Sequence, residues 1–282
     1  MTLQDWVRKG EAQLAAGHHP ERARRDAELL LLHHIGRDRA WLVAHGDEEF
    51  AGCRAIGYAA LLDRRQRGEP IQYITGEAEF YGLRFRVTPA VLIPRPETEH
   101  LVEKVIDLCR GVRQPRLIDV GTGSGAVAVA LAHELPGAQV TATDLSDSAL
   151  EIAKQNAARN SVEPRIRFLP GNLLDPVAGE RFDVVASNPP YVPIADRPSM
   201  DVEVREHEPA AAIFAGPDGL DVYRRLIPQA AGVLVPGGHI VLEIGYAQQP
   251  AVGGLLATSG FGDIEFVPDL QGIARVAVAR RP

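Results

Sequence analysis

The spacing of apolar positions predicts that the first quarter of the chain is helical. In residues 1–70, apolar side chains recur every three to four positions, as in amphipathic helices. Pro20 suits the first turn of a second helix, and Asp38 suits the N-cap of a short third one. A longer helix is expected from residue 47 to 67. Its inward side chains are expected to be Phe50, Ile56, Ala60 and Leu61.

Residues 71–96 change to the pattern of short strands followed by a stiff segment. Ile71 to Ile74 are of β-type, and apolar and basic residues alternate from Leu83 to Val87 after a turn at Gly82. The prolines of residues 94–96 then favour an extended linker. We therefore expect three parts: a helical domain (1–70), a β-hairpin and proline-rich linker (71–96), and a larger domain (97–282). The helical domain could serve substrate recognition or, equally well, act as a stabilising cap on the larger domain.

From residue 116 onward, apolar runs alternate with helical stretches, which is typical of an α/β fold with a mostly parallel sheet covered on both faces. Ser146 or Ser148 suits the cap of one of these helices. The other expected helices are 97–109, 125–134, 218–232 and 247–259. The expected strands are 116–120, 139–143, 165–169, 182–186, 239–244, 264–267 and 275–279. The irregular segment 192–218 has the length of a functional loop.

Composition narrows the possible environments and partners. The chain has 282 residues, of which 45% are hydrophobic and 24% charged, enough for one large domain and one small one. No apolar stretch approaches the ~18 residues of a membrane span, and the N-terminus lacks the pattern of a signal peptide. Cys53 and Cys109 are the only cysteines, without metal-ligand spacing. We expect a cytoplasmic protein without disulfides, structural metal or membrane contact.

The charge of the chain is unevenly distributed and disfavours a nucleic acid partner. Residues 1–70 hold 11 basic and 11 acidic residues, so the other 19 basic and 26 acidic residues account for the net charge of −7. An acidic catalytic portion is a poor electrostatic match for a phosphate backbone. We therefore expect no direct nucleic acid partner.

A short motif after the strand 182–186 is suited to hold an –NH2 group. The motif consists of Ser187, Asn188, Pro189, Pro190 and Tyr191. The prolines lack N–H groups, so the loop offers carbonyl acceptors with few competing donors. Asn188 adds a side-chain carbonyl, and Tyr191 adds a ring that can stack. The group held could belong to adenine, guanine or glutamine. The alternative is an ordinary strand end with a proline turn.

A glycine-rich loop after the strand 116–120 is suited to a nucleotide-like ligand. Asp144 ends the next strand, where a carboxylate can accept both ribose hydroxyls. The loop also fits a dinucleotide fingerprint, so these residues do not separate NAD from S-adenosylmethionine. Asp119 favours S-adenosylmethionine, because it suits the cationic amino group of the methionine moiety and is ill placed beside a pyrophosphate. The loop consists of Gly121, Thr122, Gly123, Ser124 and Gly125.

These stretches resemble a known family over nearly the whole chain. Residues 117–125 resemble motif I of class I S-adenosylmethionine-dependent methyltransferases, and residues 187–191 resemble motif IV of their amino-methylating branch. Residues 68–76 and 92–99 (Leu-Ile-Pro-Arg-Pro-Glu-Thr-Glu) further resemble the peptide chain release factor glutamine N5-methyltransferase family. The resemblance implies a Rossmann-like methyltransferase domain with S-adenosylmethionine as donor. It implies the Gly-Gly-Gln glutamine of class 1 release factors as acceptor.

The resemblance also implies roles for individual residues. Asn172 and Leu173 would contact adenine, although the commonest pattern there is an acidic residue followed by an aromatic one. Arg95, Glu97 and Thr98 would border the substrate channel, with an ordinary ion pair as the alternative for Arg95. The other implied cofactor contacts are residues 121–125, Asp144 and Asn188. From the motif that holds an –NH2 group, we expect the catalytic and substrate-binding residues to be Asn188, Pro189, Pro190 and Tyr191. We expect a monomer without a bound metal.

The sequence is also compatible with three other functions. A DNA adenine or RNA guanine methyltransferase would use the same –NH2 grip but usually needs a basic surface or a recognition domain. A non-catalytic binding module could use residues 1–70 to dock a partner. An NAD-dependent dehydrogenase would bind the dinucleotide and show no affinity for S-adenosylmethionine.

Overall fold

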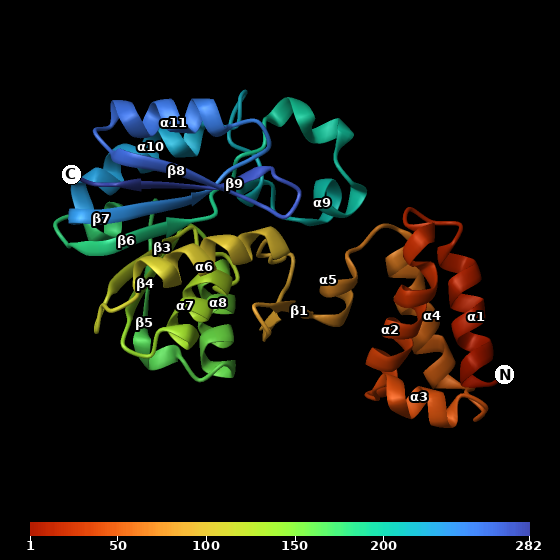
Figure 1. Ribbon diagram of the computed structural model, residues 1–282. Coiled ribbons are helices and arrows are strands. Elements are labelled where there is room, and N and C mark those ends of the chain that lie inside the picture. Colours follow the sequence, from red (N-terminus) through yellow and green to blue (C-terminus); the bar gives the residue numbers. More distant parts are fainter. The chain divides into compact units, whose positions relative to one another are not determined.

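The computed structural model describes the backbone of residues 1–282 and the side chains of all of them except Cys53. The chain forms two compact units (Figure 1). The first comprises Met1–Gly76 together with Met200–His207, and the second comprises Glu77–Ser199 and Glu208–Pro282. Cys109 is a buried free thiol. The prediction that Cys53 forms no disulfide concerns a side chain outside the described residues. Among the described residues, no helix is long and apolar enough to span a membrane.

The first unit is helical, as the apolar spacing predicts. Pro20 opens a 3₁₀ turn that leads into the second helix. The Asp38 carboxylate accepts a hydrogen bond from the backbone N–H of Trp41 at 2.7 Å, so it caps the third helix as expected. The helices are α1 (Leu3–Leu14), α2 (Ala23–Ile35), α3 (Arg39–His45), α4 (Cys53–Gln66), α5 (Ile71–Thr75) and α9 (Val202–His207).

The predicted inward face of the fourth helix is wrong at two positions. Helix α4 begins at residue 53 rather than 47, and both Ile56 and Ala60 are exposed. Tyr58 and Leu62 are buried instead, and the Tyr58 hydroxyl donates to the backbone carbonyl of Ala27 at 3.0 Å. The helix is rotated toward this aromatic side chain, which offers more apolar surface than isoleucine together with a polar tip that needs a partner.

The predicted boundary after residue 70 also differs from the structure. Residues 71–75 form helix α5 rather than a strand, since Pro70 lies at its N-cap and Ile74 packs into the core of the first unit. Helix α9, from the expected irregular segment, belongs to the same unit. Its Glu203 carboxylate pairs with the buried Arg65 guanidinium at 2.6 Å, and Arg65 also pairs with Asp26 at 2.6 Å. Long-range ion pairs of this kind leave no periodic signal in a sequence.

Replacing the capping Asp38 with alanine should lower the free energy of unfolding of the first unit by about 1 kcal/mol. The change leaves the Trp41 N–H without its side-chain acceptor. Both tryptophans of the chain, Trp6 and Trp41, lie in this unit. Denaturant unfolding followed by tryptophan fluorescence therefore reports on it, and Asp38→Ser, which keeps a capping oxygen, is the matched control. Equal midpoints for the alanine variant and the wild type would contradict the capping role.

The predicted hairpin is confirmed, but it is part of the second unit. Strands β1 (Glu77–Phe80) and β2 (Leu83–Arg86) pair antiparallel around Tyr81 and Gly82, which have φ values of 52° and 70°. Positive φ at both central residues is the mark of a tight hairpin turn. Phe80 lies in the core of the second unit. The buried Asn156 side chain accepts from the Arg86 N–H at 2.6 Å and donates to the Arg86 carbonyl at 2.9 Å.

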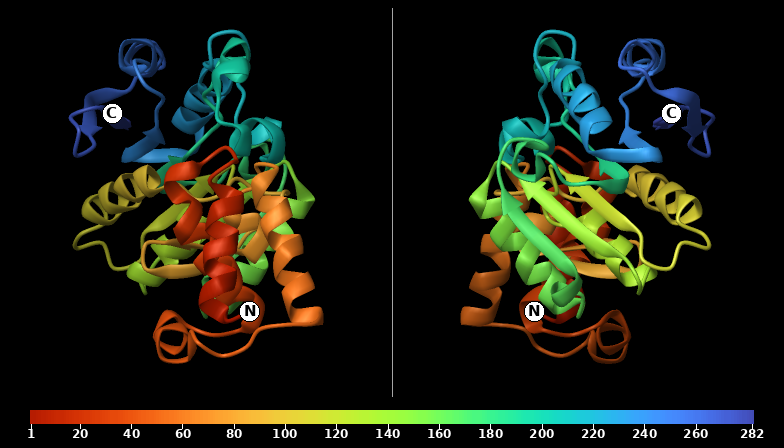
Figure 2. Two further views of the ribbon diagram at one scale, coloured as in Figure 1. Left: turned by 90° about the vertical axis from the view of Figure 1, so that its right-hand side faces the viewer. Right: turned by 90° about the vertical axis from the view of Figure 1, so that its left-hand side faces the viewer.

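The second unit contains the predicted seven-stranded sheet. The strand order is β5-β4-β3-β6-β7-β9-β8, and β9 runs antiparallel to both of its neighbours while the first five are parallel. Figure 2 shows the strands turned progressively relative to one another. The strands are β3 (Arg116–Val120), β4 (Gln139–Asp144), β5 (Ile166–Pro170), β6 (Phe182–Ser187), β7 (Leu234–Glu243), β8 (Gly262–Pro268) and β9 (Ala274–Arg280).

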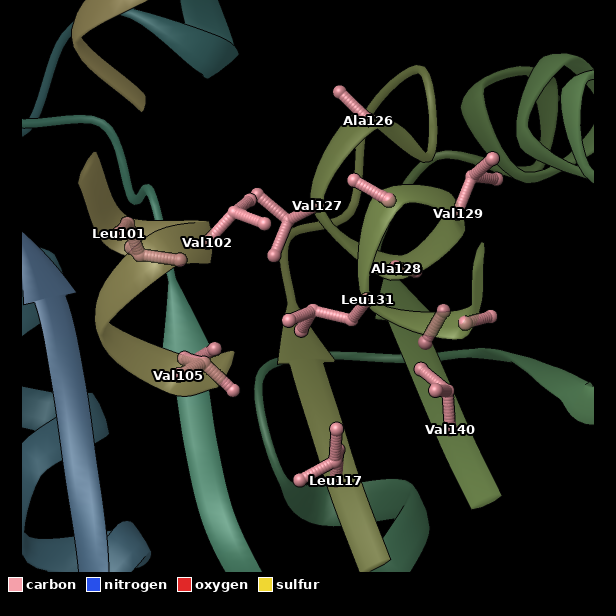
Figure 3. Packing of buried hydrophobic residues seen from close by; sticks show 14 of the residues in the cluster. Leu101, Val102, Val105, Leu117, Ala126, Val127, Ala128, Val129, Leu131 and Val140 are labelled. Carbon is pink, nitrogen blue, oxygen red and sulfur yellow. The ribbon is translucent and has the colours of Figure 1, made fainter. Parts of the chain in front are cut away.

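Helices cover both faces of this sheet. Alternate residues of one strand enter opposite cores: Leu117 contributes to one and Ile118 to the other. Figure 3 shows the first core, where side chains of α6 and α7 meet those of β3 and β4. Helices α10 and α11 cover the second core (Figure 1). The helices are α6 (Glu99–Leu108), α7 (Ala126–Glu134), α8 (Asp147–Arg159), α10 (Asp221–Val233) and α11 (Gln249–Thr258).

The topology places the predicted motifs side by side. Strand β3 pairs with both β4 and β6, so the chain reverses its direction of progress across the sheet at β3. In open parallel sheets, ligands bind outside the carboxyl ends of the strands at such a switch point. The glycine loop follows β3, Asp144 is the last residue of β4, and the motif of residues 187–191, called the Asn188 loop below, lies at the end of β6.

Candidate active site

The glycine loop leaves a backbone surface open at the end of β3. The N–H groups of Gly121 and Thr122 donate to the Thr143 carbonyl at 2.8 and 3.0 Å, which fixes the loop against β4. Gly121 and Gly123 have φ values of 73° and 56°, and a Cβ atom added to either would meet nothing within 4 Å. The side of the loop that glycine leaves bare is therefore free for a ligand to approach the backbone closely.

Asp144 holds the glycine loop and retains capacity for a ligand. One carboxylate oxygen accepts from the Gly123 N–H at 2.8 Å, and the other accepts from the Ser146 N–H at 2.9 Å. Each carboxylate oxygen has two lone pairs, so each keeps one acceptor position. The Ser146 hydroxyl in turn accepts from the Ala149 N–H at 3.2 Å, which identifies Ser146 rather than Ser148 as the cap of α8.

Asp119 is a nearly fully buried carboxylate at the end of β3, with an exposed fraction of 1%. One oxygen accepts from the Thr122 hydroxyl at 2.6 Å and from the Ala128 N–H at 3.1 Å. Burial raises the pKa of Asp119 to about 7, and the negative charge of Asp144 adds to this effect. A carboxylate held by two neutral donors is electrostatically suited to a cation, which is the chemistry expected of the methionine amino group.

The Asn188 loop is held in place by bonds to three separate segments. The Ser187 hydroxyl donates to the Val120 carbonyl at 2.6 Å, which joins the ends of β6 and β3. The Asn188 side-chain amide donates to the Thr98 hydroxyl at 3.0 Å. The Tyr191 carbonyl accepts from the Gln248 side chain at 2.9 Å. Because each bond comes from a different segment, the loop is positioned by the fold rather than by its own sequence alone.

Glu243, at the end of β7, is a site residue that the motifs do not indicate. Its side chain is 2% exposed, and it accepts from the Thr98 hydroxyl at 2.6 Å and from the Tyr191 hydroxyl at 3.1 Å. Burial raises the pKa of Glu243 to about 7, and burial also raises the pKa of the Tyr191 phenol well above its usual range. A carboxylate within the apolar run 240–244, on the strand after the Asn188 loop, was the available sequence signal.

The three residues expected at the channel rim lie in different surroundings. Thr98 is buried, with an exposed fraction of 4%, and belongs to the Glu243 network. Glu97 is exposed. The Arg95 guanidinium pairs with the buried Glu208 carboxylate at 2.5 Å, and Glu208 also accepts from the Ile93 N–H at 3.3 Å. The ion pair considered for Arg95 is therefore present in the structure.

The expected adenine contacts, Asn172 and Leu173, lie in the loop after β5 and are half-buried. The Leu173 carbonyl accepts from the Thr143 hydroxyl at 2.9 Å, which ties this loop to the end of β4. Leu173 has a φ of 53°, an uncommon conformation for a bulky residue. The Asn172 amide donates to Asp175 at 3.4 Å, so its carbonyl is left as the acceptor. Contact with adenine stays a prediction.

Comparisons with known proteins agree with this architecture. Residues 5–76 match the family model described as PrmC N-terminal domain, and residues 97–202 match the one described as methyltransferase small domain. Among solved structures, a 16S rRNA methyltransferase from Thermus thermophilus in complex with AdoMet and guanosine is 21% identical with a TM-score of 0.55. The match covers 73% of this chain and 50% of the chain of that methyltransferase. This likeness shows the fold alone.

The curated relatives are similar over their full length. The release factor glutamine methyltransferase of Moorella thermoacetica is 44% identical, over 100% of this chain and 99% of the relative. That of Koribacter versatilis is 42% identical over the same shares. The similarity thus extends over both units, including the linker motifs at residues 68–76 and 92–99. The chain belongs to the release factor glutamine methyltransferase family.

Proposed function

We propose that this chain transfers a methyl group from S-adenosylmethionine to the side-chain amide nitrogen (N5) of the glutamine in the Gly-Gly-Gln motif of class 1 release factors. The observation that carries the proposal is the juxtaposition of an open glycine loop and an amide-accepting loop at the ends of the paired strands β3 and β6. Family membership at full length supports the acceptor.

The residues at the end of β3 and β4 fit the proposed donor. The bare backbone of residues 121–123 would lie along the amino-acid part, and Asp119 would face its ammonium group. The spare lone pairs of Asp144 would accept the ribose hydroxyls. Asn172 and Leu173 would lie against adenine. When bound, the donor supplies an electrophilic methyl group on a cationic sulfur.

The Asn188 loop would position the acceptor nitrogen. A glutamine amide nitrogen is a poor nucleophile, because its lone pair is delocalised into the carbonyl. The Asn188 side-chain carbonyl and the Pro189 backbone carbonyl would each accept one of its N–H groups, which aims the lone pair away from both. Positive charge grows on this nitrogen during transfer, and the same two carbonyls would stabilise it.

Tyr191 would complete the acceptor site beside the prolines. Its ring is half-buried and its hydroxyl is bonded to Glu243, so the ring has a fixed orientation in which it could pack against a planar amide. Its phenol stays protonated, because burial raises its pKa. The proton of the methylated nitrogen would leave to water, so the proposal assigns no dedicated base.

The charge distribution favours a protein acceptor over a nucleic acid one. The acidic second unit is a poor match for a phosphate backbone, and residues 1–70 of the helical first unit carry 11 basic and 11 acidic residues. We assign the first unit to recognition of the release factor. The reaction would take place in the cytoplasm by a monomer.

The test is methyl transfer from labelled S-adenosylmethionine to purified release factor. We expect label on the wild-type release factor and none on a variant whose Gly-Gly-Gln glutamine is replaced by alanine. Duplex DNA and ribosomal RNA are the matched alternative acceptors. Label on either nucleic acid, with none on the release factor, would overturn the proposal.

A further inference from the structure

The buried Glu243 carboxylate joins two segments that are far from it in sequence. It accepts from Thr98 in the 3₁₀ turn Pro96–Thr98 and from Tyr191 in the Asn188 loop. A third hydrogen bond reaches the backbone of Glu243. The hydroxyl of Tyr223, on α10, donates to the Glu243 carbonyl at 2.7 Å. The carboxylate is therefore held at both its main chain and its side chain.

The Thr98 hydroxyl connects this carboxylate to Asn188. A hydroxyl has one proton, and at 2.6 Å from a carboxylate oxygen that proton is donated to the carboxylate. The Thr98 oxygen can then act toward Asn188 only as an acceptor. The Asn188 side chain meets this requirement with its amide nitrogen, 3.0 Å away. Thr98 is buried, so exchange of its partners for bulk water would be costly.

The direction of this chain of bonds determines which end of the Asn188 amide faces the acceptor site. A rotated amide would place its oxygen against the Thr98 lone pairs, which is an unfavourable contact between two acceptors. With the nitrogen committed to Thr98, the Asn188 oxygen is the end left for the acceptor nitrogen. This is the end that the proposed chemistry requires.

We propose that Glu243 is a positioning residue, which acts through Thr98 to fix the Asn188 amide with its oxygen toward the methyl-accepting nitrogen. The inference rests on the proposed function for the identity of the acceptor. Glu243 itself touches neither donor nor acceptor. In this role its carboxylate determines where the Thr98 proton goes, while its other oxygen holds the Tyr191 hydroxyl.

Glu243→Gln is the informative substitution, because it keeps the shape and allows the opposite direction of bonding. The glutamine amide can donate to Thr98, which frees the Thr98 proton to meet a rotated Asn188. We expect kcat to fall at least about tenfold, part of the effect of losing one charge-stabilising partner. The affinity for S-adenosylhomocysteine should stay within about threefold, and thermal stability should not fall, since a buried charge is removed.

A double-mutant cycle separates positioning from a general structural effect. In an Asn188→Ala background, Glu243→Gln should change kcat less than about twofold, because the group that it orients is gone. Thr98→Ser should retain kcat within about threefold, while Thr98→Val should lose it as Glu243→Gln does. Glu265→Gln, at an exposed glutamate paired with Lys104, is the matched control and should leave kcat unchanged. Equal losses from Glu243→Gln in both backgrounds would overturn the proposal.

The pH profile gives a second readout. Protonation of Glu243 should weaken the arrangement, so wild-type kcat should fall below about pH 7, and Glu243→Gln should lose this pH dependence. The groups that face this carboxyl are Thr98 and Tyr191, with the charges of Glu97 and Arg275 acting from the 3₁₀ turn and from β9. Glu97 raises its pKa and Arg275 lowers it.

A measurement without turnover distinguishes this inference from the proposed function. In protein labelled with ¹⁵N-asparagine, the Asn188 side-chain –NH2 signal should exchange slowly with water in the wild type and faster in both Glu243→Gln and Thr98→Val. Unchanged exchange in these variants would overturn the positioning role. Absence of methyl transfer to release factor by the wild type would overturn the proposed function instead, and the exchange result would still decide on Glu243.

Discussion

Replacing Asn188 with alanine should lower kcat for methyl transfer to release factor by about a hundredfold or more. Removing one preorganised partner of a developing charge costs about this much in comparable sites. The change leaves only the Pro189 carbonyl to hold the acceptor nitrogen. It also leaves the Thr98 hydroxyl without the Asn188 donor. Single-turnover kinetics at saturating S-adenosylmethionine measure the chemical step directly.

The binding controls locate this loss in the chemical step. The dissociation constant for S-adenosylhomocysteine should change less than about fivefold in Asn188→Ala, because the proposed cofactor contacts lie chiefly at the ends of β3 and β4. Asn160→Ala is the matched control: its amide donates to the Arg84 and Asn156 carbonyls, and the variant should retain wild-type kcat. Turnover by Asn188→Ala within about threefold of the wild type would contradict the proposed role.

Asn188→Asp tests the same site by a different route. When ionised, the aspartate keeps an acceptor but has no donor for Thr98, and it adds a second carboxylate close to the buried Glu243. Like charges in a buried site disfavour each other's ionisation. We therefore expect kcat to fall for the aspartate variant as well, and to fall further at higher pH, where the ionised carboxylate has no proton to donate to Thr98.

Local sequence patterns are sufficient to predict the sheet and the motifs at its edge. Most strands contain a short apolar run, and Asp119, Asp144 and Asn188 lie at or next to the carboxyl ends of β3, β4 and β6. Strands of a parallel sheet place their carboxyl ends along one edge, so chain order alone predicts that these residues gather. The glycines at 121 and 123 indicate the backbone conformation that the structure contains.

Features that depend on tertiary contacts could not be predicted in this way. Glu243 lies more than fifty residues after Asn188 and acts through Thr98, so no local spacing relates the three. Helix α9 joins the first unit through an ion pair between Glu203 and Arg65. The apolar spacing places Ile56 in a buried stripe, but the anchored Tyr58 determines the rotation of α4. In each case a specific side-chain partner overrides the local pattern.

Asp119→Asn should weaken the binding of S-adenosylhomocysteine by about ten- to hundredfold at pH 8. A hydrogen bond to a charged group contributes about 1.5–3 kcal/mol, which corresponds to that range. The amide removes the negative charge that would face the ammonium group while it keeps one acceptor for Thr122 and Ala128. Isothermal titration calorimetry measures the affinity, and the free chain should be no less stable, since a buried charge is absent.

The pH dependence of this binding has a definite sign. Burial raises the pKa of Asp119 from 3.8 to about 7, so the carboxyl of the free chain is ionised above that pH and neutral below it. The ammonium group favours the ionised form, so wild-type affinity should be highest above pH 7 and should fall up to tenfold per pH unit below it. The Asp119→Asn variant should lack this dependence.

A ligand without the amino-acid part provides the control. 5′-Methylthioadenosine shares the nucleoside and the thioether sulfur with S-adenosylhomocysteine but has no ammonium group to meet Asp119. Its affinity should be nearly the same for the wild type and Asp119→Asn, and nearly independent of pH between 6 and 8. If both ligands lose affinity equally in the variant, then Asp119 acts only by holding Thr122 and the start of α7, and the contact with the ammonium group is wrong.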